Sequence, residues 1–174
     1  MIFNDFRKAK QKSRNWRKSN KIIVATQGVF DILHFAHINY LAIAAKQGQK
    51  LIVAMDSDKR VRIRKGPDRP IQRWAIRSAQ LDALGFIDAI FPKRHFVSNM
   101  FYAINIKPHV LVISVDSLFD DTDIRALTSR GVFVICLPRD PNISTTQLIY
   151  ESKKRNKTLQ QIRSLSRRPH RKHR

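Results

Sequence analysis

The sequence is poor in acidic residues, in cysteine, and in glycine and proline. Its 174 residues include 34 Lys and Arg but only 13 Asp and Glu, and the resulting formal charge of +21 excludes an acidic, solvating disordered chain. With 5 Gly and 7 Pro, the chain has too little of either residue for a collagen-like or low-complexity protein. Hydrophobic residues make up 43%, close to the share in ordinary globular domains. Together these figures predict one folded domain.

The scarcity of cysteine and of long apolar runs limits the setting of the protein. A single cysteine, Cys136, excludes an internal disulfide; because it lies in the apolar run 132–137, we expect a buried strand residue rather than a redox or metal-binding one. No run approaches the roughly 18 apolar residues of a membrane span, and the N-terminus lacks the apolar core of a secretory signal. We therefore expect no membrane span and a reducing, cytoplasmic setting.

Most of the positive charge belongs to the two ends of the chain. Residues 1–21 hold eight basic residues and one acid, and residues 150–174 hold ten basic residues and one acid. The segment 22–149 holds sixteen basic and eleven acidic residues, an ordinary balance. We predict a basic N-terminal extension over 1–21, one domain over 22–149, and a basic C-terminal helix or tail over 150–174.

Short apolar runs alternate with segments of helical period inside the predicted domain, a pattern typical of a parallel sheet covered by helices. We expect five strands, at 22–25, 51–55, 89–91, 110–114 and 132–137. Helices are expected at 38–46, 74–84, 100–106 and 121–129, and from Ser144 onward. The fold class is therefore α/β: a Rossmann-like, doubly wound parallel sheet of five strands, whose ligands bind beyond the carboxyl ends of the strands.

Two histidines stand at the expected junction of the first strand and the first helix. Gly28 would let a ligand approach the backbone closely, and His34 and His37, three residues apart, can face one point. Imidazoles at a helix N-terminus could donate hydrogen bonds to a phosphate. The pair could also be one capping and one core histidine, and no further metal ligands stand nearby.

Two further segments carry groups that suit anions. The polar segment 56–69 shows neither period, so we expect a long loop, in which the four basic residues of 62–69 could bind a polyanion or remain solvated surface. Ser144, Thr145 and Thr146 open the last expected helix, where hydroxyl and backbone donors form an anion site or only a helix cap.

The run Gly-Val-Phe-Asp-Ile-Leu-His-Phe-Ala-His, residues 28–37, resembles the G-x-F-D-x-x-H-x-G-H signature of the cytidylyltransferase-like nucleotidyltransferases, a superfamily with a small Rossmann-like fold. Ala36 replaces the family's glycine, which adds a methyl group beside the phosphates. Residues 53–58 and Lys-Gly-x-x-Arg-Pro-Ile from Lys65 onward are similar to the ADP-heptose synthase adenylyltransferase domain. Arg139 with Ile-Ser-Thr-Thr looks like the R-x-x-x-I-S-T-T motif of glycerol-3-phosphate cytidylyltransferase.

This resemblance implies a nucleoside-triphosphate site. The implied catalytic residues are His34, His37, Lys65 and Arg139. The implied nucleotide-binding residues are Gly28, Val29, Phe30, Asp31, Asp116, Ser144, Thr145 and Thr146, and the implied phosphate or substrate loop carries Arg64 and Arg69. Asp116 stands where relatives carry a glycine-containing turn near the ribose, and it could equally be structural. No protein metal site is expected; Mg²⁺ would come with the triphosphate.

The implied reaction is transfer of a nucleoside monophosphate from ATP to a sugar phosphate, with release of pyrophosphate. A CTP-dependent enzyme acting on glycerol 3-phosphate is the alternative, because the motifs point both ways. A third interpretation is a non-catalytic scaffold that binds nucleic acid through its basic ends, with Trp16 stacking on a base. The expected partners are a nucleoside triphosphate and a small phosphorylated acceptor; a homodimer and polyanion contact through the tails are also compatible with the sequence.

Overall fold

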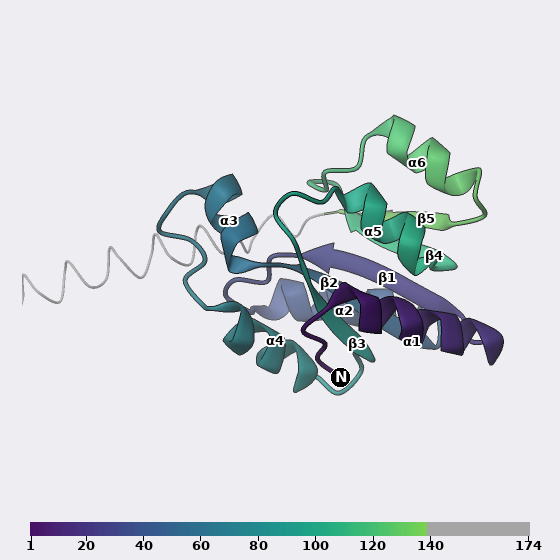
Figure 1. The fold of residues 1–174 in the computed structure, drawn as a ribbon, viewed down its shortest axis with the longest axis horizontal. Helices are drawn as coiled ribbons and strands as arrows, with labels where there is room; N and C mark the ends of the chain where they lie inside the picture. The colour runs from purple at the N-terminus through teal and green to yellow at the C-terminus, as the bar shows by residue number, and fades with distance from the viewer. Residues whose placement is uncertain (139–174) are drawn as a thin grey trace, which may run out of the picture. The chain divides into compact units, whose positions relative to one another are not determined.

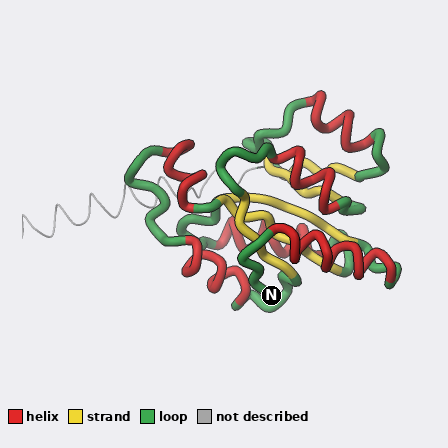
Figure 2. The backbone as a smooth tube through the Cα atoms, in the orientation of Figure 1, coloured by secondary structure: helices red, strands yellow, loops and turns green. Residues whose placement is uncertain are grey.

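A five-stranded parallel sheet forms the centre of the molecule (Figures 1 and 2). The computed structural model describes residues 1–138, which belong to one compact unit. The strands, in sheet order β3-β2-β1-β4-β5, are β1 (Ile23–Gly28), β2 (Lys50–Asp56), β3 (Ala89–Lys93), β4 (Val110–Ser114) and β5 (Phe133–Leu137). Every neighbouring pair is parallel, so the predicted Rossmann-like α/β sheet is confirmed.

Helices cover both faces of the sheet. They are α1 (Phe6–Lys18), α2 (Phe35–Ala45), α3 (Asp58–Lys65), α4 (Trp74–Asp82), α5 (Asn99–Ile106) and α6 (Asp121–Thr128). One apolar core lies between the sheet and α1, α5 and α6, and a second lies between the sheet and α2 and α4. Neighbouring residues of β2 alternate between them, with Ile52 in the first core and Val53 in the second. None of the described helices is long and apolar enough to cross a membrane.

The N-terminal 21 residues, predicted to be an extension outside the domain, instead complete its first core. Before α1, the backbone pairs with β3: the amide of Phe3 donates to the carbonyl of Ile90 at 2.8 Å. Ala9 and Trp16 are buried in the core, and Ser13 donates to the carbonyl of Ile106 at 2.6 Å. Trp16 therefore faces the sheet, and the prediction that it could stack on a nucleic-acid base is wrong.

Helix α3 lies in the segment 56–69, which we predicted to be a loop. Ser57 caps the helix by accepting from the amide of Arg60, and Gly66, with φ of 96°, ends it. The residues that α3 buries are Arg60 and Val61. Because one of its two buried positions is an arginine, the helix shows no apolar period, and hydrophobic patterning missed it.

Cys136 is exposed, contrary to our expectation of a buried strand residue. It lies on β5, which among the strands of residues 1–138 pairs only with β4 and forms one edge of the sheet. Strands at the centre of the sheet are covered on both faces and flanked on both sides, whereas β5 leaves Phe133 and Cys136 exposed. An apolar run therefore predicted the strand correctly but not its place at the edge.

Candidate active site

The two motif histidines lie together where β1 ends and α2 begins. His34 is the N-cap residue of α2, and His37 lies one turn into the helix. Their imidazole rings stack with centroids 3.7 Å apart and planes inclined by 21°. The ring of Phe30 meets His37 edge-on at 5.4 Å. The structure thus places two potential donors at a helix N-terminus, where backbone amides and the helix dipole favour an anion.

The loop before the histidines needs glycine at position 28 because the ring of Phe30 packs against it. A Cβ atom at Gly28 would lie 2.7 Å from the ring of Phe30, so a side chain there would displace that ring. Phe30 itself has a left-handed backbone, with φ of 49°. Gly28 therefore allows the fold of the 28–34 loop; its predicted contact with a nucleotide, like those of Val29 and Phe30, stays a prediction.

Asp31, predicted to bind the nucleotide, holds a neighbouring loop of its own chain. Its carboxylate pairs with Arg69 at 2.8 Å and accepts from the amide of Gln72 at 3.0 Å. Burial alone would raise the pKa of Asp31, but hydrogen bonds from the backbone of Gln72 and Ile71, with Arg69, hold this pKa below its usual value. Asp31 and Arg69 thus join the histidine loop to the segment after α3.

Lys65 is the last residue of α3 and is exposed. It follows Arg64 in the chain, and the charge of Arg69 acts on its ammonium group. Partial desolvation lowers the pKa of its ammonium group, and the charges of Arg69 and Arg64 lower it further. Arg64 points back into the protein and pairs with Asp56 at 2.6 Å. The two predicted loop arginines are therefore each held by a carboxylate of the fold, Arg64 by Asp56 and Arg69 by Asp31, whereas Lys65 is exposed.

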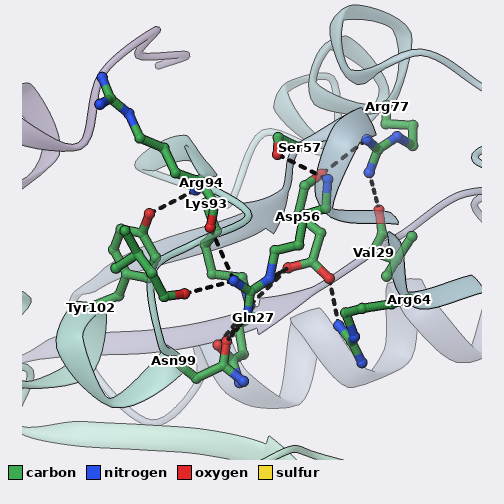
Figure 3. Close-up of polar contacts among 12 residues, drawn as sticks. Gln27, Val29, Asp56, Ser57, Arg64, Arg77, Lys93, Arg94, Asn99 and Tyr102 are labelled. Carbon is green, nitrogen blue, oxygen red and sulfur yellow. Dashed lines mark hydrogen bonds and ion pairs between the residues drawn. The ribbon is translucent and has the colours of Figure 1, made fainter. Parts of the chain in front are cut away.

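Asp56 is the centre of a buried polar cluster that the sequence did not reveal (Figure 3). Its carboxylate pairs with Lys93 and with Arg60 at 3.0 Å, in addition to Arg64. Lys93, only 1% exposed, also donates to Gln27 at 2.8 Å and to Asn99 at 2.9 Å. Burial lowers the pKa of Lys93 to about 8, although Asp56 opposes the shift. This cluster, Gln27, Asp56, Arg60, Arg64, Lys93 and Asn99, joins the carboxyl ends of β1, β2 and β3 to α3 and α5.

Arg77 is a third buried cation, after Arg60 and Lys93, that sequence reasoning missed, and it fixes the loops around the histidines. Its guanidinium, fully buried, donates to the carbonyl oxygens of Val29, Asp56 and Gln72 and pairs with Asp58 at 2.7 Å. Its position in α4 offered a signal: Trp74, Arg77 and Leu81 share one helix face, the one that packs on the sheet.

The remaining predicted residues lie farther along the chain. Asp116 is exposed in the turn that follows β4, and β4 is the neighbour of β1 in the sheet. Asp116 thus shares the carboxyl edge of the sheet with the histidines. Arg139, Ser144, Thr145 and Thr146 lie outside the described residues. Among residues 1–138, no group of three His, Cys, Asp or Glu side chains is placed to hold a metal ion.

Known proteins resemble this chain over most of its length. The family model described as "Cytidylyltransferase-like" matches residues 25–151. The D-beta-D-heptose 1-phosphate adenylyltransferase of Bordetella bronchiseptica is 38% identical over 129 residues, which cover 73% of this chain and 79% of that protein. The bifunctional protein HldE of Aeromonas hydrophila is 50% identical over 70 residues, which cover 40% of this chain and only 15% of that protein.

Solved structures agree with these matches. The lipopolysaccharide core biosynthesis protein of Thermoplasma volcanium gives a TM-score of 0.58 at 28% identity, covering 69% of this chain and 97% of the other. The pantoate-beta-alanine ligase of Francisella tularensis gives 0.60 at 16% identity over 88% of this chain and 77% of the other, which shows a shared fold alone. The family model, the Bordetella relative and the paired histidines at the end of β1 lead to one assignment: the chain belongs to the cytidylyltransferase-like family of nucleotidyltransferases.

Proposed function

We propose that the chain transfers the adenylyl group of ATP to a sugar phosphate and releases pyrophosphate. The observation that carries this proposal is the stacked pair His34 and His37 at the N-terminus of α2, beyond the carboxyl end of β1, where sheets of this kind bind phosphates. The Bordetella relative, which is named for adenylyl transfer to D-beta-D-heptose 1-phosphate, supports ATP as donor and a sugar 1-phosphate as acceptor.

In the proposed reaction, an oxygen of the acceptor phosphate attacks the α-phosphorus of ATP in line. The new phosphorus–oxygen bond forms as the bond from the α-phosphorus to the α,β-bridging oxygen breaks, and that electron pair leaves with pyrophosphate. Little covalent chemistry falls to the protein in such a transfer. Its task is to hold two anions in contact and to neutralise the charge that develops on the leaving oxygen.

We assign that task first to the histidine pair. With rings 3.7 Å apart, the two imidazoles can donate to neighbouring phosphate oxygens of one nucleotide, and the amides of the first turn of α2 add further donors. Phe30, packed edge-on against His37, restricts the orientation of that ring. The loop residues Gly28, Val29, Phe30 and Asp31 then form the wall of the phosphate site.

The other predicted residues receive supporting roles in this proposal. Lys65 and Arg139 neutralise charge on the bridging oxygen, Ser144, Thr145 and Thr146 hold the outer phosphates, and Asp116 lies near the ribose. Arg64 is already paired with Asp56, and Arg69 with Asp31. We therefore propose that these two arginines position the segment that carries Lys65 and do not contact the acceptor directly.

We propose that Mg²⁺ enters the site on the triphosphate. Mg²⁺ commonly binds through the phosphates of its substrate and through water rather than through a cage of protein ligands. When bound, the ion would neutralise negative charge on the β- and γ-phosphates. The residues of this chain still have to orient the α-phosphorus toward the acceptor.

The test measures pyrophosphate release by the full chain with ATP or CTP, each paired with D-beta-D-heptose 1-phosphate or glycerol 3-phosphate. We expect turnover with ATP and the heptose phosphate, and a loss of about 10²–10³ in turnover for His34→Ala and His37→Ala. His95→Ala is the matched control, because His95 lies after β3 and packs on Phe96. A His34→Ala variant with turnover near that of His95→Ala would contradict the assignment.

The same panel distinguishes the second candidate, CTP-dependent transfer to glycerol 3-phosphate, which the Arg139 and Ile-Ser-Thr-Thr motif favours. A preference for CTP with glycerol 3-phosphate would mean that the donor is CTP and the acceptor is glycerol 3-phosphate. The reaction would still be nucleotidyl transfer with release of pyrophosphate. No pyrophosphate from any pair would support the non-catalytic scaffold.

A further inference from the structure

Helix α1 carries a dense row of cations, only part of which contacts the rest of the fold. Seven of its 13 residues are Lys or Arg, and none is acidic. No ion pair joins any of the seven to a carboxylate within residues 1–138. Three of the seven still interact with the fold: Lys10 donates to Asn105, Arg17 donates to the carbonyl of Lys107, and Lys12 lies over the ring of Trp16. The other four cations make no such contact within the described part of the chain, unlike the cations around Asp56. A function of these four charges has to be sought outside the folded domain.

The cations face outward because the opposite side of α1 is committed to the sheet. Phe6, Ala9, Ser13 and Trp16 pack on the first core, and Phe6 contacts the rings of Phe91, Phe101 and Tyr102. At 100° per residue, Arg7, Lys8, Arg14 and Lys18 all lie within about 60° of the direction opposite to that side. All four are exposed. Figure 1 shows α1 along one face of the sheet beside α5.

These charges work against the helix that carries them. Arg7 and Lys8 lie in its first turn, where the helix dipole favours acidic residues. Like charges three or four residues apart, such as Arg14 and Lys18, repel each other. The core contacts of α1 have to offset this repulsion, so local stability does not explain the composition of the outer face.

We propose that the outer face of α1, formed by Arg7, Lys8, Arg14 and Lys18, binds the phosphate backbone of a nucleic-acid duplex. Arg7 and Arg14 are about 10 Å apart along the helix axis and Lys18 is about 6 Å farther, a straight row that can follow a backbone. Lysine and arginine rows of this kind bind duplexes through phosphates, without reading base sequence.

Two features favour a duplex over other polyanions. Single-strand binders stack bases on aromatic side chains, and both aromatic residues of α1, Phe6 and Trp16, face the sheet. Helices that lie in a membrane surface insert their apolar side, which α1 buries against β3 and α5. The outer face of α1 therefore offers a partner positive charge but no apolar or stacking side chains.

The test measures binding of a fluorescein-labelled 20-base-pair duplex to the full chain by anisotropy, over a series of NaCl concentrations. The variant R7Q/K8Q/R14Q/K18Q should lose about tenfold or more in affinity near 0.1 M salt, and its slope of log K against log salt should fall by about 3 to 4. The matched control K46Q/K59Q/R125Q/R130Q removes the same charge from exposed positions elsewhere. It should bind as the parent chain does.

Equal losses in the two variants would overturn the proposal, because net charge alone would then explain binding. It would also be overturned by tighter binding to a single strand or to anionic vesicles, or by displacement of the duplex with ATP. A parent-like circular dichroism spectrum confirms that the α1 variant is folded. Pyrophosphate release should be unchanged in it, so this result is separate from the test of nucleotidyl transfer.

Discussion

The carboxyl edge of the sheet and the outer face of α1 hold the same two residue types in opposite surroundings. At the sheet edge, Arg60, Arg64 and Lys93 converge on one buried carboxylate, Asp56. On α1, Arg7, Lys8, Arg14 and Lys18 face outward, and none is paired with a carboxylate in residues 1–138. The first set connects strands and helices of the domain, whereas the second set leaves its charge available to a partner. Within residues 1–138, Lys and Arg therefore have two unrelated uses.

Removing the shared carboxylate should produce the largest effect. Asp56→Asn leaves two deeply buried cations, Arg60 and Lys93, without a counter-charge, and the free energy of unfolding should fall by about 3–5 kcal/mol. Urea denaturation followed by circular dichroism measures this loss. Adding Lys93→Met to Asp56→Asn removes one of the unpaired cations and should recover part of the stability.

The control for Asp56→Asn is Asp82→Asn. Asp82 pairs with the N-terminal amino group at 2.8 Å, but both groups are about half exposed. Exposed pairs contribute only about 0–1 kcal/mol, so this variant should remain close to the parent chain. Similar losses in the two variants would show that burial around Asp56 has little energetic consequence, and the contrast between the two regions would fail.

Lys93 should also make stability depend on pH, by a smaller amount. Its pKa is about 8 in the folded chain against 10.5 for an ordinary lysine, so between these values the unfolded chain binds more protons. The free energy of unfolding therefore rises with pH through this window, by about 1–2 kcal/mol from pH 8 to 9.5. The groups facing Lys93 are Asp56, Arg60, Arg64, Gln27 and Asn99.

Urea denaturation at several pH values between 8 and 9.5 measures this rise. Lys93→Met should remove its Lys93 component, leaving any part due to Lys65, whose pKa is also lowered. The window stops below pH 10 because burial raises the pKa of Tyr40 to about 12, which lowers stability at higher pH. An identical rise in the parent chain and the variant would assign the pH dependence to groups other than Lys93.

The same contrast explains which parts of the fold the sequence predicted. Strands buried on both faces, such as 51–55 and 110–114, appear as unbroken apolar runs, and they were predicted nearly to the residue. Helix α3 was missed because it buries an arginine. Residues 1–21 were assigned to an extension because of their charge. Their spacing also contains a helical stripe that packs on the core, formed by Phe6, Ala9, Ser13 and Trp16.

The site was predictable where a motif is continuous and not where it depends on folding. The histidine pair belongs to one run of ten residues, and in the structure the two rings stack with centroids 3.7 Å apart. The partners of Arg64 and Arg69 could not be read in the same way. Asp56 is eight residues from Arg64 and Asp31 is 38 residues from Arg69, and no local period connects such positions. Sequence spacing identified these arginines as anion-binding; the fold pairs both with its own carboxylates.

The smallest expected effect tests whether the α1 cations oppose folding. Lys8→Glu puts a carboxylate in the first turn, near the N-cap Asp5, and removes a like-charge neighbour of Lys12, so the free energy of unfolding should rise by about 0.3–1 kcal/mol. Lys18→Glu, in the last turn, should gain less, because the helix dipole there favours cations. Urea denaturation at 0.05 and 0.5 M NaCl measures both, and salt should reduce the difference by screening. If Lys8→Glu is less stable than the parent chain, Lys8 stabilises the fold, and its charge does not need a partner to explain it.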